Sequence, residues 1–253
     1  MNADKFSVLL AKKYDGADPT GLWASDKLDG VRAYWNGHQL LSRNGNPFDA
    51  PKWMTDLLPA DLHLDGELYA GPGMFHVAVG AARSKGAGDT WRNIKFMVFD
   101  APSVDGIFLE RFQAARDAVL RAEQTHGDGC PVQIVTHTQV RSERHLWKLH
   151  RMATATGIEG TMLRDPHSTY HRRRHGSLMK IKDHRDSEAV VISHKPGLDK
   201  GSYVVRDQRR GVEFSLAALQ PARPGATVTY RFQELTRHGV PRHPVMIAVR
   251  DYE

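Results

Sequence analysis

Cysteine is almost absent from this chain of 253 residues, which contains Cys130 and no other. An intramolecular disulfide is therefore excluded, and a chain of this length can bury a stabilising core without one. The 14 histidines show no metal-ligand spacing with cysteine, so we expect no zinc site. The longest apolar run near the start, residues 6–11, is too short for a membrane span of ~20 residues. It is also too short for a signal-peptide core, so the sequence as it stands predicts a cytoplasmic protein, or a periplasmic one if a leader was trimmed.

Positive charge is in excess. Lysine and arginine number 35 against 29 aspartates and glutamates, which leaves a net charge of +6. This balance favours a polyanionic partner, with nucleic acid first among the candidates. The hydrophobic content of 40% is ordinary for a globular protein, and the length fits one large domain or two modest ones.

The predicted secondary structure changes in character near residue 183. Before it, short β-rich runs alternate with amphipathic helices, and Asn36-Gly37 predicts a hairpin turn. We expect Asp49 to cap one helix and Ser142 to cap another that ends at Gly157. Strands are predicted at residues 22–27, 31–35, 39–42, 63–69, 94–99, 161–164 and 178–182, and a helical stripe at residues 109–120. The polar residues 183–186 indicate a hinge, and the short β-like runs beyond it indicate a small β-barrel of the OB type.

The most specific pattern is K-x-D-G-x-R at residues 27–32. It can be a solvated charged turn between two strands, or it can carry a nucleophilic lysine. An amine attacks only when deprotonated, so a nucleophilic Lys27 needs positive charge or desolvation around it. A following Asp-Gly lets backbone approach a ligand, and an arginine can fork onto phosphate oxygens.

Further short elements follow at wide intervals, each of which also has an ordinary structural explanation. They are Asp65-Gly66-Glu67, a strand that ends in Phe99-Asp100, the pair Glu159-Gly160, and the strand residues Lys180 and Lys182. The two lysines share one face of their strand, because strand side chains alternate with period two. Their order and strand context make a joint coincidence far less credible than any single match.

This ordered set resembles the covalent nucleotidyltransferases: DNA ligases, RNA ligases and mRNA capping enzymes. Residues 25–35 and 41–46, together with 233–237 and 239–244 near the other end, are similar to the small two-domain bacterial ATP-dependent DNA ligases of the Lig E type. The resemblance covers essentially the whole chain. It implies an α+β fold in which an adenylation domain with mainly antiparallel sheets, residues 1–184, precedes an OB-fold β-barrel, residues 185–253. The resemblance also implies a role in DNA repair and replication.

The resemblance further implies a reaction in three phosphoryl transfers. Lys27 attacks the α-phosphate of ATP and holds AMP, the AMP passes to the 5′-phosphate of a nick, and the 3′-hydroxyl displaces it. By the same match Glu67 and Glu159 hold Mg²⁺ (or Mn²⁺) and ribose, and Phe99 stacks on adenine. Lys180 and Lys182 neutralise the α-phosphate, while Asp29 and Arg32 orient the ribose and the nick ends.

Several arginines complete the expected sites. Arg43 is expected to hold the 5′-phosphate of the nick, and the run Arg172, Arg173 and Arg174 to contact DNA phosphates, although such a run can be a solvated loop. Arg242 and Arg250 suit the pyrophosphate leaving group, because guanidinium forks match phosphate oxygens. No inserted DNA-binding domain is visible, so nicked double-stranded DNA is expected to be held by the two core domains of a monomer.

Two alternatives remain open. Within the superfamily, the rival is an RNA ligase or a capping enzyme that uses GTP; the sequence around Arg43 and the stretch at residues 233–237 argue against it. The rival from another class is a non-catalytic nucleic-acid binder that uses the barrel and the basic loops. A pure binder has no need of the lysine and its partner carboxylates.

Overall fold

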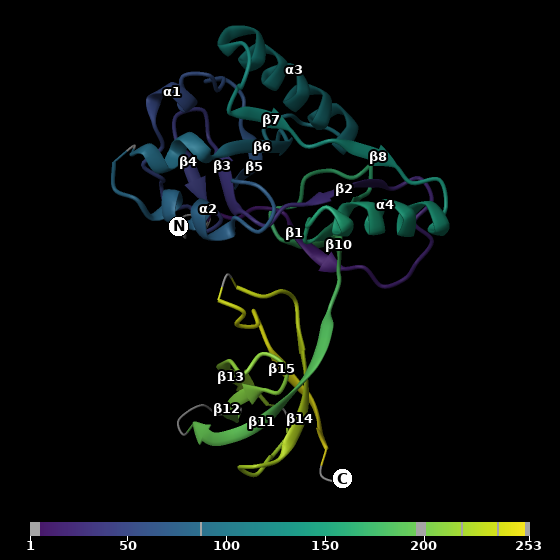
Figure 1. Cartoon of the computed structure of the whole chain (residues 1–253). Helices are drawn as coiled ribbons and strands as arrows, with labels where there is room; N and C mark the ends of the chain where they lie inside the picture. The colour runs from purple at the N-terminus through teal and green to yellow at the C-terminus, as the bar shows by residue number, and fades with distance from the viewer. Residues whose placement is uncertain (1–5, 87, 196–200, 219, 237, 251–253) are drawn as a thin grey trace, which may run out of the picture. The chain divides into compact units, whose positions relative to one another are not determined.

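The computed structural model describes residues 6–86, 88–195, 201–218, 220–236 and 238–250. They form two compact units, Met1–Ile181 and Lys182–Glu253. The first unit combines sheets with helices and the second is a closed β-barrel, which confirms the predicted order of an α+β domain and a barrel (Figure 1). Within the described ranges, no helix is long and apolar enough to cross a membrane.

The first unit contains two five-stranded sheets. One has the order β1-β10-β9-β2-β8, formed by Leu10–Lys13, Arg174–Lys182, Gly160–Arg164, Trp23–Lys27 and His137–Gln139. The other has the order β4-β3-β5-β6-β7, formed by Leu40–Ser42, Val31–Trp35, Leu64–Tyr69, Lys95–Asp100 and Val132–Ile134. Most of the pairs are antiparallel, as expected, while β1–β10 and β6–β7 are parallel.

Helices cover one face of each sheet. Helix α3 (Phe108–His126) packs against β6 and β7, α2 (Phe75–Arg83) packs against β3, β5 and the 3₁₀ helix η1 (Asp89–Asn93), and α4 (Glu143–Ala155) packs against β9 and β2 (Figure 1). The buried stripe of α3, which includes Phe108, Phe112 and Val119, recurs every three or four residues and confirms the predicted helix. The opposite faces of the two sheets are thereby left to form the walls of a pocket.

The predicted cap of α4 is confirmed, because the Ser142 hydroxyl accepts a hydrogen bond from the His145 N–H at 3.2 Å. Gly157 follows the helix with a φ of 84°, a backbone conformation that suits glycine at a helix end. The hairpin at Asn36-Gly37 is also confirmed, since Trp35 pairs with Leu40 across it. These local signals worked because side chain and backbone act within a few residues.

Other local predictions were wrong. Asp49 does not cap a helix: α1 (Lys52–Thr55) starts after Pro51, and the Asp49 carboxylate instead accepts from the Gly86 N–H at 2.8 Å. Helix α2 was not anticipated. Of residues 183–186, which were expected to form a hinge, only Asp183 and His184 lie outside the strands, because β11 (Arg185–Lys195) starts at Arg185. Asp186 pairs with Arg231 of β14 (Thr227–Phe232), with nitrogen–oxygen distances of 2.8 and 2.9 Å.

The second unit is a closed barrel in the order β11-β12-β13-β15-β14, completed by β12 (Ser202–Asp207), β13 (Glu213–Ala217) and β15 (Val245–Arg250). Alternate residues of its strands fill the interior, as Val228, Tyr230 and Phe232 of β14 do. The buried carboxylate of Asp207 accepts from the Tyr230 hydroxyl at 2.5 Å and the Ser187 hydroxyl at 3.1 Å. These hydrogen bonds compensate a desolvated charge in the barrel core.

Candidate active site

Lys27 is the last residue of β2, where it pairs with Gly160 of the neighbouring strand β9. That pairing brings Lys27 beside Glu159, 132 residues away in the sequence. The ammonium of Lys27 donates to the Glu159 carboxylate, and the two side chains are only 18% and 8% exposed. The amine is therefore held in one place by an ion pair that is largely shielded from water.

The glycines of the two Asp-Gly pairs permit close contacts between strands. A Cβ at Gly30 would lie 2.3 Å from the Leu68 carbonyl oxygen, and a Cβ at Gly66 would lie 2.7 Å from the Met97 carbonyl oxygen. Gly66 lies inside β5, so Asp65-Gly66 is not a turn in this protein. Both glycines let backbone approach backbone where a side chain cannot fit.

Arg32, Asp65 and Glu67 share one face of the sheet. Arg32 of β3 lies directly across from Glu67 of β5. Both guanidinium contacts to Asp65, from Nε and from Nη2, measure 2.6 Å, and the Asp65 side chain is fully buried. Burial lowers the pKa of Arg32, but the charge and hydrogen bonds of Asp65 outweigh it and raise that pKa overall. The arginine is a permanent cation in a fixed orientation.

A register shift in β6 accompanies the placement of Phe99. Asp65 pairs with Asp100 and Gly66 pairs with Val98, so Phe99 is the extra residue between them. Its ring lies 4.6 Å from the guanidinium carbon of Arg32. Bulges next to active sites commonly redirect a side chain, and here the ring lines the pocket between the sheets.

This pocket of the first unit has a volume of about 250 Å³. It brings together six residues that the sequence singled out: Lys27, Arg32, Arg43, Glu67, Phe99 and Lys180. Arg174, which was expected to contact DNA, also lines it and donates to the Ala11 carbonyl. With Arg164 and Asp26, which also line it, six lysine or arginine side chains, two carboxyl groups and the ring of Phe99 surround a single space, a composition that suits a nucleotide phosphate and base.

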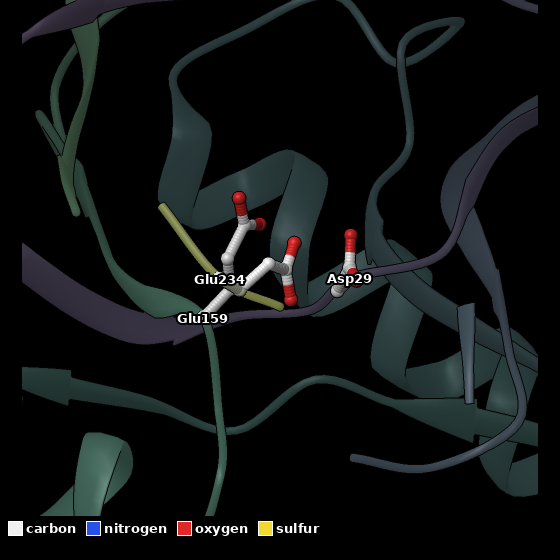
Figure 2. A group of neighbouring side chains, drawn as sticks. All are labelled: Asp29, Glu159 and Glu234. Carbon is white, nitrogen blue, oxygen red and sulfur yellow. The ribbon is translucent and has the colours of Figure 1, made fainter. Parts of the chain in front are cut away.

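Carboxyl groups lie near the amine of Lys27. A carboxylate oxygen of Asp29 lies within 4.8 Å of one of Glu159, and Figure 2 shows both side chains; Glu234 in the same view belongs to the second unit. Burial raises the pKa of Glu67 to about 7, although the positive charges of Arg32 and Lys27 pull it down. These oxygen donors fit Mg²⁺, which is usually held by one or two carboxylates together with substrate phosphates.

Other expected site residues lie elsewhere. Arg172 and Arg173 are exposed, and Arg172 donates to the Tyr34 hydroxyl at 3.4 Å. Lys182, Arg242 and Arg250 belong to the second unit. There the Lys182 ammonium donates to the Gln233 side chain at 3.0 Å, Arg242 pairs with Glu234, and Arg250 donates to Thr229 at 2.9 Å. Arg237 and residues 251–253 lie outside the described residues.

Sequence reasoning missed His137, Met162 and Arg164, which also line the pocket. The Nδ1 atom of His137 lies 2.9 Å from the Val135 carbonyl, and Arg164 lies 3.1 Å from the buried carboxylate of Asp100. His137 lies on the short strand β8, which no pattern indicated. Met162 and Arg164 could have been found, because they follow Gly160 at the two-residue spacing of one strand face.

Comparison with known proteins decides the family. The model of the ATP-dependent DNA ligase domain matches residues 1–182. The chain belongs to the ATP-dependent DNA ligases. The model of the DNA ligase OB-like domain matches residues 200–250 of this ligase. The chain is 29% identical over 245 residues to a DNA ligase of Haemophilus influenzae, and the match covers 93% of this chain and 89% of the relative.

Solved structures agree with this membership. A structure from a study of Lig E DNA ligases superposes on the ligase with a TM-score of 0.86 and 30% identity, over 96% of this chain and 99% of the other. The Chlorella virus DNA ligase shares the fold with a TM-score of 0.61 and 22% identity, over 96% and 99% of the two chains. The adenylation domain, the OB fold and the resemblance to the Lig E type are thereby confirmed.

Proposed function

We propose that Lys27 of this ligase is the residue that takes AMP from ATP, and that the pocket around it is the nucleotide site. The observation that carries the proposal is the convergence of Lys27, Arg32, Glu67, Phe99 and Lys180 on one space. The ammonium first leaves its ion pair with Glu159 and gives one proton to water. The amine then attacks the α-phosphorus, a P–N bond forms, and pyrophosphate departs with the electrons of the broken P–O bond.

Phe99 provides the surface on which adenine stacks. Arg32 lies against its ring, 4.6 Å from the centroid, and the ring lines the pocket, where a base can stack on it. Arg32 and Asp29 orient the ribose and later the nick ends, and Glu159 adds a ribose contact. Because Asp65 fixes the Arg32 guanidinium, the arginine needs little reorganisation when the substrate arrives.

Phosphate charge is neutralised by the cations of the pocket. Lys180 supports the proposal because it lines the pocket together with Lys27, and Lys182 follows it by two residues on β10. Arg43 lies at the pocket edge after β4 and would receive the 5′-phosphate of the nick. Phosphoryl transfer depends mainly on such positioning and charge stabilisation.

Glu67 and Glu159 would hold Mg²⁺ (or Mn²⁺), which supplies positive charge to the phosphates when bound. Support comes from the ion pair of Glu159 with Lys27 and from the position of Glu67 in the lining of the same pocket. Glu67 must then bind as the ionised carboxylate, which its pKa of about 7 makes available near neutral pH.

The second unit contributes Arg242 and Arg250. We assign both to the departing pyrophosphate, which is present in the first step and absent from the two later ones. Functional domains of residues 1–184 and 185–253 would then move about the two residues between β10 and β11, Asp183 and His184. In this account Arg242→Ala or Arg250→Ala impairs self-adenylation more than the sealing of an adenylated nick.

The substrate is a nick in double-stranded DNA with a 3′-hydroxyl and a 5′-phosphate, held by a monomer. Support comes from the membership of the ATP-dependent DNA ligases and from the exposed arginines of residues 172–174. Positively charged side chains supply most of the binding energy that does not depend on base sequence.

The test is a sealing assay with a labelled nicked duplex, Mg²⁺ and a choice of nucleotide. ATP should give the sealed strand and GTP should not, and a nick that carries a 5′-hydroxyl should remain open. Preferred sealing of an RNA strand, or preferred use of GTP, would identify an RNA ligase or a capping-type enzyme. Binding of DNA with no sealing under any condition would identify a non-catalytic nucleic-acid binder.

A further inference from the structure

Tyr170 lies in the segment between β9 and β10, outside every motif of the sequence, yet its hydroxyl reaches the face that carries Arg32. The hydroxyl donates to the Asp65 carboxylate at 2.6 Å and accepts from the Leu9 N–H at 3.1 Å. Burial, then the negative charge of Asp65, raises the pKa of Tyr170 well above that of an ordinary phenol. The hydroxyl therefore remains a donor throughout the working pH range.

These hydrogen bonds close a ring of four groups. Arg32 donates from Nη2 both to Asp65, at 2.6 Å, and to the Leu9 carbonyl, at 3.2 Å. The Leu9 N–H in turn donates to Tyr170, whose hydroxyl donates to the same carboxylate oxygen that Arg32 uses. Asp65 is fully buried, so each hydrogen bond that its carboxylate accepts offsets part of the cost of removing a negative charge from water.

The ring of hydrogen bonds limits the rotation of the Asp65 carboxylate. A carboxylate at the end of a short side chain rotates readily about its last bond, and a fork from one arginine can follow that rotation. Tyr170 adds a third donor from a different direction. Two cations contact the aromatic ring of Tyr170, with the guanidinium carbons of Arg111 and Arg172 at 5.6 and 5.8 Å from its centroid. The direction from which the hydroxyl approaches is therefore well determined.

Arg32 transmits this constraint to the pocket. Its guanidinium lies 4.6 Å from the ring of Phe99, and both side chains line the same space as Lys27. A shift of Asp65 would move the guanidinium and release the ring that it supports. We propose that Tyr170 is a positioning residue that orients Arg32, and through it Phe99, by holding the Asp65 carboxylate. This inference rests on the proposed function, since it assumes that Arg32 and Phe99 bind the nucleotide.

The test uses Tyr170→Phe, which removes one hydroxyl and keeps the aromatic ring in contact with the two arginines. The measurement is the single-turnover rate of self-adenylation over a range of ATP concentrations. We expect the maximal rate to fall about ten- to hundredfold, because small misplacements of positioned groups are costly in transfer reactions. The ATP concentration for half-maximal rate should change less, since Tyr170 itself touches no substrate in this account.

A matched control separates positioning from stability. Tyr230→Phe removes an equivalent hydrogen bond from a tyrosine to a buried aspartate, Asp207, in the barrel. It should lower the thermal unfolding temperature as Tyr170→Phe does, without the same loss of rate. Equal loss of rate in both variants at matched stability would overturn the proposal.

A double-mutant cycle tests the route through Arg32. Arg32→Lys keeps a cation but loses the fork onto Asp65, so adding Tyr170→Phe to it should have little further effect. Multiplicative losses of rate in the double variant would contradict the proposal. If Tyr170→Phe does not fold at the assay temperature, Asp65→Asn disrupts the same ring of hydrogen bonds by changing the carboxylate. It should reproduce the selective loss of rate in folded protein, and a normal rate would overturn the proposal.

Different results would remove the proposed function and the role of Tyr170. A wild-type protein that forms no AMP adduct would remove the proposed function. A wild-type protein that forms the adduct, together with a Tyr170→Phe variant indistinguishable from Tyr230→Phe, would remove only the role of Tyr170.

Discussion

The ammonium of Lys27 is bound to the carboxylate of Glu159, and both side chains are largely shielded from water. The pair links the last residue of β2 to the residue that precedes β9. Glu159 therefore has two successive tasks in our account: it places the amine before the reaction, and it accepts metal or ribose once the amine has moved away. Its substitution is informative because these tasks require a negative charge rather than mere bulk.

Glu159→Gln should raise the Mg²⁺ concentration that gives half-maximal self-adenylation by about ten- to hundredfold, the usual cost of disturbing a metal environment. The glutamine keeps the shape of the side chain and loses its charge. The measurement is a Mg²⁺ titration of adduct formation, with the exposed Glu123→Gln of α3 as control. An unchanged Mg²⁺ requirement would show that Glu159 serves Lys27 or ribose alone.

Gly30→Ala should destabilise the first unit by about 1–3 kcal/mol, because its Cβ would overlap the Leu68 carbonyl. Gly80 is the matched control. It is exposed within α2, and its Cβ would meet nothing within 4 Å. Gly80→Ala should therefore stabilise the protein by about 0.5–1 kcal/mol. Urea unfolding measures both, and equal effects would show that β3 and β5 do not require the glycine.

The stability of the protein should fall in acid through His137. Burial, then the positive charge of Arg164, lowers the pKa of His137 to about 3, from 6.5 for an ordinary imidazole. Below pH 6.5 the unfolded chain binds a proton that the folded protein refuses, so stability falls as the pH falls toward 3. His137→Gln removes this contribution.

The unfolding temperature of His137→Gln, relative to that of the wild type, should therefore rise steadily as the pH is lowered from 7.5 to 4.5. All other titrating groups are common to both proteins and cancel in the difference. A difference that stays constant with pH would show that His137 has the same pKa in the folded and the unfolded protein, and would contradict the prediction.

The arginines of residues 172–174 should separate into two functions. Arg173 is exposed, so Arg173→Ala should reduce the salt dependence of nick binding by about 0.9 in log K against log salt, one phosphate contact. Arg174 lines the pocket around Lys27, so Arg174→Ala should also slow self-adenylation, which involves no DNA. The exposed Arg116→Ala of α3 is the control. Identical behaviour of Arg173→Ala and Arg174→Ala in both assays would refute this separation.

Much of the architecture was predictable, because it depends on short-range signals. The alternation of residues 31–35, the Ser142 cap and the run of barrel strands were all visible in the sequence. Helix α2 and the strand at His137 escaped prediction because the first contains an exposed glycine and the second has only three residues. Asp49 looked like a cap, but its carboxylate binds a backbone N–H 37 residues away.

The residues of the candidate active site also divide into those that the sequence indicated and those that only the fold revealed. The motif order indicated Lys27, Arg32, Glu67, Phe99 and Lys180, and the structure places all five around one pocket. The supporting groups could not be found in this way. Tyr170 and Asp65 are 105 residues apart, and only the folded arrangement of β5 and the segment before β10 brings them together. The position of Phe99 depends likewise on a register shift that no spacing announces.

The most direct test of the central claim is covalent labelling of Lys27. The wild type, Lys27→Ala and the surface control Lys148→Ala of α4 are incubated with Mg²⁺ and ATP labelled in the α-phosphate, and are separated under denaturing conditions. We predict an acid-labile labelled band at the mass of the protein for the wild type and for Lys148→Ala, and none for Lys27→Ala. The Lys27→Ala variant should still seal a nick that was adenylated beforehand, at a reduced rate. A labelled band of wild-type intensity from Lys27→Ala would contradict the account.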